Sequence, residues 1–422
     1  MLATVGTDGD IFPFFGLGRV LRSRGYRVTL ATHEHFRARA ANAGLEFLTL
    51  VSGAETEDLL SRRSLWHPIL GPWTIATWGR PLMHRQYAEL RRLVSPADSA
   101  LIASPGVIGA RLVAEERSIP LVSIVLQPWL IPSRMAPPAM MGGGTLSPNA
   151  PRFVGAAYDR AFDLVGWFLV GRGLNRLRSS LGMAPVRRVF QWWLSERLAL
   201  GLFPDWYGPP QGDWPPQLRL TGFPIGDSRD DSGLPGDLGA HCARDRPTVA
   251  FSFGTGMKHA AALFSECIEA CRLGGWNGIL LTRFREQLPE NLPAFVKHCG
   301  FVAFERLFPR CGAVVHHGGI GTTAKALGAG IGQVILPFGF DQLDNAKRVV
   351  RLGVGTWLPR ADHRAGPIVE ALRKVLVPEV RSRARAIAGR FDGMDGLRDA
   401  VNQIEGYWQS DEGARSGNIP VR

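Results

Sequence analysis

The chain of 422 residues has few of the residues that build metal sites and disulfide frameworks. Its five cysteines all lie in the second half, and no CxxC pair occurs among Cys242, Cys267, Cys271, Cys299 and Cys311. An odd count without such pairs argues against both a structural zinc site and a set of disulfides. We therefore expect buried free thiols in a reducing compartment.

Long apolar runs are absent as well. No 18 consecutive residues are apolar, so the sequence predicts no helix that crosses a bilayer. The chain begins directly with an apolar strand and a glycine turn, without the charged and apolar regions of a signal peptide. We expect a cytoplasmic protein, with peripheral contact at the inner membrane face as an open alternative.

Blocks of like charge are also lacking. The net charge is +12, but the basic residues are scattered and form no run of five. No nucleic-acid recognition motif accompanies this charge, so we expect no nucleic-acid partner. Three explanations of the basic excess remain open: an anionic membrane surface, an anionic substrate, and an Arg-rich composition without a functional role.

Short apolar segments alternate with helical ones in two separate series. The predicted strands are 2–5, 27–31, 101–104 and 121–126 in the first series, and 248–253, 278–282, 312–316 and 333–337 in the second. Such alternation is typical of parallel sheets with right-handed crossovers. The sequence thus predicts an α/β protein with two Rossmann-like, doubly wound domains that face a central crevice.

Composition suggests where these domains begin and end. Prolines and an acidic polar run interrupt the pattern between 204 and 237, which is typical of an interdomain connection. The predicted organisation is an N-terminal domain (1–205), a linker (206–240), a C-terminal domain (241–395) and a final segment (396–422). That segment contains a predicted amphipathic helix, 397–408, followed by a tail.

The segment HHGGIGTT at 316–323 carries the strongest functional signal. It lies where a strand ends at His316 and a helix is expected to start near Gly321. Glycines let the backbone approach a phosphate, whose charge is stabilised by free N–H groups at a helix N-terminus. A glycine turn beside surface histidines is the structural alternative, but three glycines, two histidines and two threonines favour a phosphate site.

Two further segments follow strands in the same way. Asp341 and Gln342 stand side by side, as a pair that binds vicinal sugar hydroxyls would. Asp10, in the loop 6–10, is either an ordinary helix N-cap or a base for an attacking hydroxyl. The loop 6–10 lacks GxGxxG spacing, so a dinucleotide fingerprint is not supported.

Together these segments resemble the family 1 glycosyltransferases, which have the GT-B fold. The run GAVVHHGGIGTTAKALGAGIGQVILPFGFDQLDNAKRVVRLGVG (312–355) is similar to their donor-binding signature, and GTDGDIFPFFGLGRVLRSRGYRV (6–28) to their first strand, loop and helix. The similarity covers nearly the whole chain and is strongest for bacterial rhamnosyltransferases and sterol glucosyltransferases.

This resemblance implies a role for each matching residue. His316 would bind the donor diphosphate, Asp341 and Gln342 the sugar, and Asp10 would be the catalytic base. The other residues implied to bind the donor are Gly9, Gly254, Thr255, Phe301, Val302, Gly318, Gly319, Gly321 and Thr322. The resemblance also implies a hexose transfer with inversion from UDP-glucose or dTDP-rhamnose, and a helix 397–408 that crosses back to the first domain. No DxD-like pair stands beside the phosphate turn, so we expect no metal, and we expect no further cofactor.

The expected acceptor is apolar and lipid-like. Trp66, Trp73, Trp129 and Met135 lie in the first domain, and the last two belong to a stretch rich in Pro, Gly and Met at 127–150 that we expect to be mobile. Aromatic and methionine side chains suit an adaptable apolar site, although any one of them is more often core. The open alternatives are a glycosyltransferase for natural-product aglycones, a nucleotide-sugar epimerase and a non-catalytic nucleotide-sugar binder.

Overall fold

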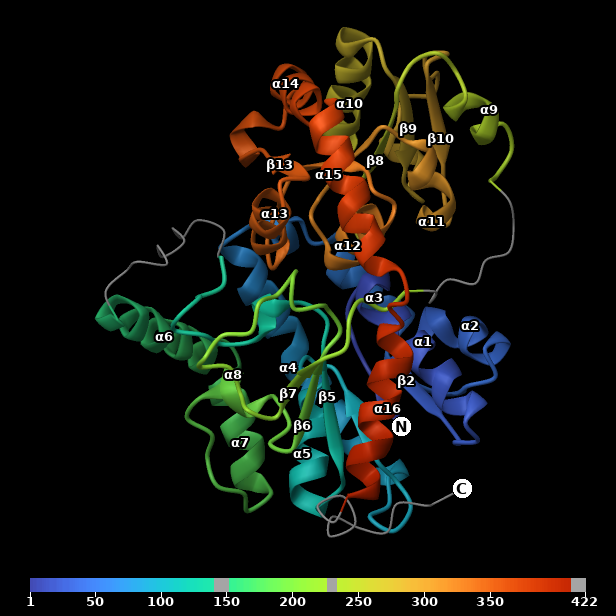
Figure 1. The fold of residues 1–422 in the computed structure, drawn as a ribbon. Helices are drawn as coiled ribbons and strands as arrows, with labels where there is room; N and C mark the ends of the chain where they lie inside the picture. Colours follow the sequence, from blue (N-terminus) through green and yellow to red (C-terminus); the bar gives the residue numbers. More distant parts are fainter. Residues whose placement is uncertain (140–151, 226–233, 411–422) are drawn as a thin grey trace. The chain divides into compact units, whose positions relative to one another are not determined.

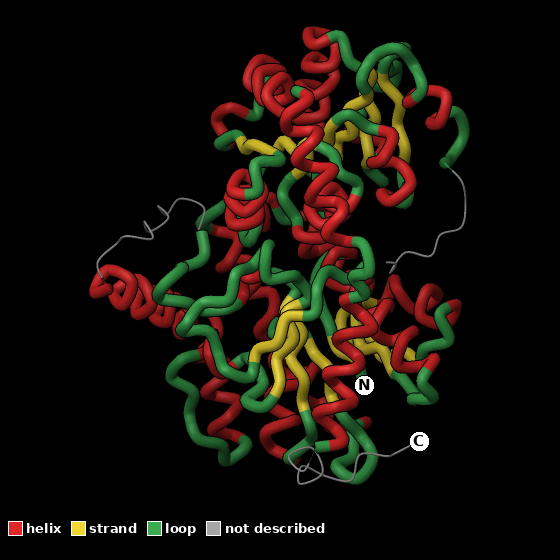
Figure 2. Tube along the Cα trace, in the orientation of Figure 1, coloured by secondary structure: helices red, strands yellow, loops and turns green. Residues whose placement is uncertain are grey.

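The computed structural model describes residues 1–139, 152–225 and 234–410. The chain folds into two compact units. Unit 1 comprises Met1–Leu65, Ile69–Asp227 and Asp395–Arg422, and unit 2 comprises Trp66–Pro68 and Ser228–Met394. Each unit contains one sheet whose faces are covered by helices (Figure 1, Figure 2).

The sheet of unit 1 has seven strands in the order β3-β2-β1-β4-β5-β6-β7, and every neighbouring pair is parallel. Its strands are β1 (Leu2–Ala3), β2 (Thr29–His33), β3 (Glu46–Val51), β4 (Leu101–Ala103), β5 (Leu121–Val125), β6 (Leu198–Gly201) and β7 (Leu218–Leu220). The described helices of this unit are α1 (Asp8–Ser23), α2 (Arg37–Asn42), α3 (Gly53–Ser61), α4 (Leu70–Leu93), α5 (Ile108–Arg117), α6 (Arg152–Gly166), α7 (Arg172–Ser180), α8 (Val189–Trp192) and α16 (Gly396–Gln409).

The sheet of unit 2 has six strands in the order β10-β9-β8-β11-β12-β13, again all parallel. They are β8 (Thr248–Ser252), β9 (Asn277–Leu281), β10 (Val296–Cys299), β11 (Ala313–His316), β12 (Gly332–Ile335) and β13 (Gly355–Trp357). The described helices are α9 (Leu238–Cys242), α10 (Ala261–Gly274), α11 (Phe304–Leu307), α12 (Ile320–Gly328), α13 (Gln342–Arg351), α14 (Ala365–Val375) and α15 (Pro378–Ala388).

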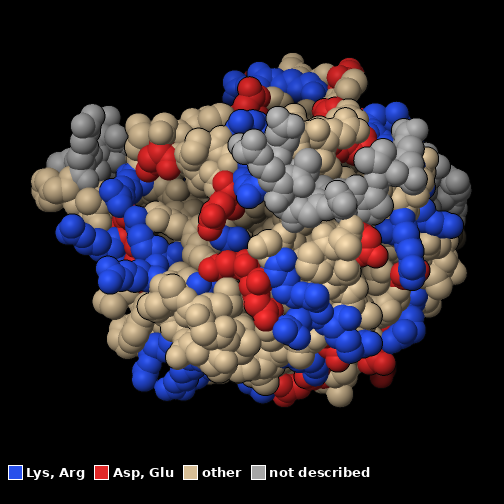
Figure 3. Space-filling view, turned by 90° about the horizontal axis from the view of Figure 1, so that it is seen from below, with Lys and Arg blue, Asp and Glu red and all other residues tan. Residues whose placement is uncertain are grey.

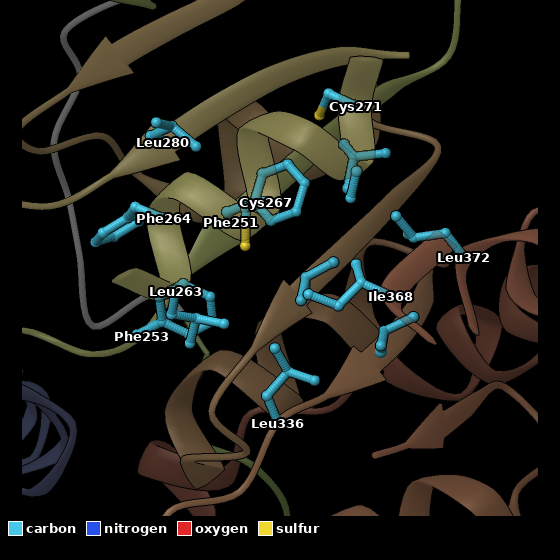
Figure 4. Packing of buried hydrophobic residues seen from close by; sticks show 14 of the residues in the cluster. Phe251, Phe253, Leu263, Phe264, Cys267, Cys271, Leu280, Leu336, Ile368 and Leu372 are labelled. Atoms are coloured by element: carbon cyan, nitrogen blue, oxygen red, sulfur yellow. The ribbon is translucent and has the colours of Figure 1, made fainter. Parts of the chain in front are cut away.

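The strands carry apolar side chains on both faces, which is typical of parallel sheets covered by helices on both sides. β8 and β9 are buried along their whole length, as strands covered by helices on both sides must be. Figure 4 shows Phe251 of β8 and Phe264 of α10 in the core of unit 2, with the thiols of Cys267 and Cys271 among them. All five cysteines are free, and burial raises the pKa of Cys271 to about 12.

The stretch expected to link the domains, 206–240, is folded into unit 1 over much of its length. β7 pairs with β6 as the last strand of the first sheet. Tyr207 and Phe223 are fully buried there, with ring centroids 5.1 Å apart. Prolines in this stretch therefore shape a packed segment, and the division between units falls later, at Asp227.

The last described helix, α16, packs against α1 within unit 1. A Cβ on Gly16 would lie 2.4 Å from Leu397 Cδ1, so the glycine allows the two helices to approach closely. Arg24 donates a hydrogen bond to Asn402 over 2.6 Å and forms an ion pair with Glu405. The ring of Tyr26 lies 5.4 Å from that of Trp408. The stripe of apolar residues read from the sequence thus faces the first helix of the chain.

Among the described residues, no helix combines the length and the apolar composition needed to span a bilayer. Lys and Arg are scattered over the face seen in Figure 3, between uncharged and acidic side chains. This dispersion agrees with the absence of long basic runs in the sequence.

Candidate functional site

The imidazole of His316, at the end of β11, is fully buried and uses both of its nitrogens within unit 2. Nδ1 accepts a hydrogen bond from Gly318 N over 3.1 Å, so the proton must reside on Nε2, which lies 3.0 Å from Gln333 Oε1. Burial lowers the pKa of His316 to about 3, so the ring is neutral. The structure therefore does not present His316 to a phosphate, contrary to the role inferred from the sequence.

The next residue, His317, is placed differently. Its ring is partly exposed and lies against two of the predicted donor-site glycines. A Cβ on Gly254 would lie 3.1 Å from this ring, and one on Gly319 only 2.5 Å from its Nε2. Nδ1 is 3.5 Å from Ser252 O, and burial lowers the pKa of His317 to about 4. His317, to which the sequence alone assigned no role, thus joins the loop after β8 to the loop after β11.

Helix α12 begins beside this histidine with free backbone donors. Its N-cap is Gly319, which has no side chain to accept hydrogen bonds from the first turn. Thr322 lies in that turn, while the hydroxyl of Thr323 donates back to Gly319 O over 3.0 Å. Gly318 has φ +94°, a conformation that a side chain at this position would disfavour. The N–H groups at Ile320, Gly321 and Thr322 thus lie at a helix N-terminus without a side-chain cap, the kind of helix end that suits an anion.

The Asp341–Gln342 pair is fixed to this turn by a residue that sequence reasoning missed. Asn345, fully buried one helical turn later, donates to Gly318 O over 2.9 Å and to Asp341 Oδ2 over 2.7 Å. Gln342 Oε1 accepts from Phe338 N and Gly339 N, over 2.7 and 3.2 Å, so its amide nitrogen is the group left for a ligand. The spacing of four residues from Asp341 on α13 is the signal that could have identified Asn345.

The other residues predicted to bind the donor divide into exposed and buried ones. Thr255 lies partly exposed in the loop after β8, and the ring of Phe301, just beyond β10, is 53% exposed. Val302 is instead buried in a core cluster with Leu307. The Val302 side chain is therefore unavailable to a ligand, and its role in unit 2 is packing.

In unit 1, the carboxylate of Asp10 caps the start of α1. Asp10 Oδ2 accepts from Thr7 N over 2.8 Å and from Thr7 Oγ1 over 3.1 Å, while Gly9 is exposed in the first turn. Burial raises the pKa of Asp10, and the hydrogen bonds from Thr7 act in the opposite direction. Beside this loop, His33 Nε2 accepts from Gly6 N over 3.2 Å, and sequence reasoning missed it too.

The residues expected to bind the acceptor differ in their exposure and in the unit to which they belong. Trp73 and Met135 are exposed in unit 1 and Trp129 is partly buried there. Trp66 belongs to unit 2, where it packs on the core with its ring 6.2 Å from that of Phe340, so its assignment to the first domain is wrong. Of the stretch 127–150, residues 140–150 lie outside the described residues.

Comparison with known proteins agrees with this division into two units. Residues 1–135 match the glycosyltransferase family 28 N-terminal domain, and residues 279–390 match the erythromycin biosynthesis protein CIII-like C-terminal domain. Sterol 3-beta-glucosyltransferase UGT80A2 of Arabidopsis thaliana is 30% identical over all of this chain and 67% of its own length. Glycosyltransferase GtfC of Amycolatopsis orientalis is 28% identical over 93% of this chain and 94% of its own.

The chain spans about two thirds of the plant sterol glucosyltransferases that it matches, and about a third of the yeast protein of that name. Solved structures share the fold at lower identity. SnogD of Streptomyces nogalater superposes with a TM-score of 0.62 at 20% identity, over 96% of this chain and 98% of its own. The spinosyn rhamnosyltransferase SpnG superposes with a TM-score of 0.65 at 19% identity, over 96% and 99%. The chain therefore belongs to the family 1 glycosyltransferases, which have the GT-B fold.

Proposed function

We propose that this protein transfers a hexose from a nucleotide diphosphate sugar to a hydroxyl of an apolar acceptor. The observation that carries the proposal is the cluster of loops in unit 2. There Asn345 joins the turn before α12 to Asp341, which precedes Gln342, and the ring of His317 lies against Gly319 at the N-terminus of α12. This arrangement offers donors for a diphosphate beside acceptors and a donor for sugar hydroxyls.

In this proposal His317, and not His316, contacts the diphosphate. The amides of Gly321 and Thr322 would share its charge, and an imidazole N–H would add a hydrogen bond. Because these groups are fixed before the donor binds, they can stabilise the charge that develops on the leaving diphosphate. Asp341 and the amide nitrogen of Gln342 would bind the hexose, with Thr255 and Phe301 on the nucleotide side.

We propose inversion by single displacement, with Asp10 as the base. The acceptor oxygen would form a bond to the anomeric carbon while the bond to the diphosphate oxygen breaks, and the acceptor proton would pass to Asp10. A carboxyl whose pKa is raised by burial is a better base than an exposed one. The reaction would need no metal, since the proposed groups for the diphosphate are amides and an imidazole.

The acceptor class rests on the relatives. Several are named for sterol glucosylation, and a structural neighbour of the same fold is named for a spinosyn. We propose an apolar alcohol as acceptor and UDP-glucose or dTDP-rhamnose as donor, in a cytoplasmic enzyme. A natural-product aglycone is the second candidate, because the match to GtfC covers nearly the full length of both chains.

The test replaces Asp10 by asparagine, which keeps an oxygen for the cap on Thr7. Asp10→Asn should lower turnover by about 10²–10⁴-fold and leave nucleotide-sugar affinity unchanged. Asp8→Asn, on the same helix turn, is the matched control and should retain activity. Turnover is followed by mass spectrometry over a panel of apolar and polar alcohols with both donors. Full activity of Asp10→Asn would overturn its role, and absence of any nucleotide-sugar binding would overturn the proposed function.

The donor assignment has its own test in Gln342→Ala. This variant should bind free UDP or dTDP as the unmodified protein does, but lose affinity for the nucleotide sugar, as measured by calorimetric titration. Equal affinities of both proteins for both ligands would contradict the assignment of Gln342 to the hexose.

A further inference from the structure

One exposed surface of unit 1 combines large apolar side chains with exposed arginines. It lies on the continuous helical segment formed by α6, the π-helical turn Trp167–Gly171 and α7. Phe153 is 74% exposed and Leu164 57% exposed on this segment, and Val165, Trp167 and Phe168 are exposed too. Large apolar side chains at this exposure are common singly, but not gathered along one helix.

The spacing of these residues places them on one side. Phe153, Arg160, Leu164 and Phe168 follow one another at intervals of seven and four residues, so they form a stripe along the helix. Arg160 is exposed within the stripe. We call the exposed set Phe153, Arg160, Leu164, Val165, Trp167 and Phe168 the α6 stripe.

The opposite side of the helical segment packs against other residues of unit 1. The ring of Phe162 lies 4.5 Å from that of Phe190, and a Cβ on Gly166 would lie 2.4 Å from the Phe190 ring. Leu169 and Leu174 are buried below. The helical segment therefore already packs its other side on unit 1, and the α6 stripe is its outer, exposed face.

Both acidic residues of the segment form ion pairs with arginines. The only acidic residues between 152 and 180 are Asp159 and Asp163. Arg188 pairs with both over 2.6 Å, and Arg134 pairs with Asp159 over 2.7 Å. Asp159 is buried, and the charge of Asp163, whose side chain is 20% exposed, is compensated by Arg188.

Exposed arginines continue the outer side beyond the stripe. Arg172 and Arg176 are exposed at the start of α7, and the guanidinium of Arg172 lies 5.8 Å from the centroid of the Trp167 ring. The outer side of the segment therefore presents aromatic and aliphatic groups next to cations, and its one nearby carboxylate, Asp163, is paired with Arg188. An anionic lipid surface has the complementary chemistry, with acyl chains below a layer of negative headgroups.

We propose that the α6 stripe docks unit 1 on an anionic lipid bilayer, with its apolar side chains in the interface and Arg160, Arg172 and Arg176 at the headgroups. This deepens the proposed function, since a membrane surface is where an apolar acceptor would be found. It needs no membrane-spanning helix, because an amphipathic helix lies in the plane of the interface.

The experiment is cosedimentation of the purified protein with vesicles of phosphatidylcholine containing about 30% phosphatidylglycerol, at low salt, against pure phosphatidylcholine. The unmodified protein should bind the anionic vesicles and be released as salt increases. Leu164→Glu with Phe168→Glu should weaken this binding by about tenfold or more, since it replaces apolar contacts by repelled charges. Leu273→Glu is the matched control, because Leu273 is a leucine of similar exposure (48%) on α10 in unit 2.

Unchanged thermal unfolding of the double variant would show that it is folded. Failure of the unmodified protein to bind anionic vesicles would overturn the proposal, and so would equal binding by the double variant. Self-association abolished by the double variant, without vesicle binding, would instead identify the stripe as a contact between copies of this chain. Transfer to a detergent-dispersed acceptor, measured in parallel, keeps failure of docking distinct from failure of the proposed function.

Discussion

Replacing His316 and His317 by alanine, one at a time, should separate stability from nucleotide binding. The two residues are neighbours in sequence, yet the structure gives them different surroundings. His316 is buried with both ring nitrogens hydrogen-bonded inside unit 2, whereas His317 is partly exposed against Gly254 and Gly319. We expect His316→Ala to lower the free energy of unfolding, and His317→Ala to lower the affinity for a nucleotide diphosphate.

The contacts of each ring set the expected sizes. His316→Ala removes two hydrogen bonds, at about 0.5–1.5 kcal/mol each, and leaves the buried Gln333 Oε1 without a donor, at about 1–3 kcal/mol. Gln333 Nε2 already has no hydrogen-bond partner in the described structure, so rearrangement offers little relief. With the losses overlapping in part, we expect about 2–4 kcal/mol. His317→Ala breaks one long contact of 3.5 Å, which is worth about 1 kcal/mol or less.

The assay combines urea unfolding with calorimetric titration of UDP and dTDP. A hydrogen bond to a charged diphosphate is worth about 1.5–3 kcal/mol, so His317→Ala should weaken nucleotide binding by about 10–100-fold. His316→Ala should bind with nearly unchanged affinity under conditions where it is folded. If His316→Ala unfolds like the unmodified protein and loses nucleotide binding while His317→Ala binds normally, the reasoning from the structure is refuted.

Four further outcomes are expected. Burial lowers the pKa of His316 to about 3 in the folded protein, against an ordinary value of 6.5, so the unfolded chain binds more protons between these two values. The free energy of unfolding should therefore fall by up to about 1.4 kcal/mol per pH unit as pH drops through this window. Urea unfolding of His316→Gln should show a shallower dependence of stability on pH. Leu397→Ala should cost about 2–5 kcal/mol, because Leu397 is buried against Gly16, and activity should fall with the folded fraction in a denaturant series. Asn345→Ala should weaken nucleotide-sugar binding more than binding of the free nucleotide in titrations, and full affinity for the nucleotide sugar would contradict the role of Asn345. Transfer by the unmodified protein should survive chelation with EDTA, and loss of activity in EDTA would contradict a reaction without metal.

Local patterns in the sequence predicted two parallel sheets and the loops that follow β8, β11 and β12, but they did not predict the strands β3, β6, β7, β10 and β13. Alternating apolar segments and glycine turns report on the nearest residues, which decide whether a stretch is a strand, a helix or the joint between them. The helix near the C-terminus was predicted in the same way, from the stripe that includes Leu397 and Trp408.

Only the tertiary structure decided which side chains at these joints are buried and which are accessible. His316 is the last residue of β11 and is buried with a hydrogen bond to Gln333 on the neighbouring strand, whereas His317 begins the following loop and is partly exposed. The surroundings of Asn345 and Trp66 could not be predicted for the same reason, since each contacts residues that are distant in sequence or lie across a loop. Such contacts leave no periodic signal, because they arise from the pairing of strands and helices after the local elements have formed.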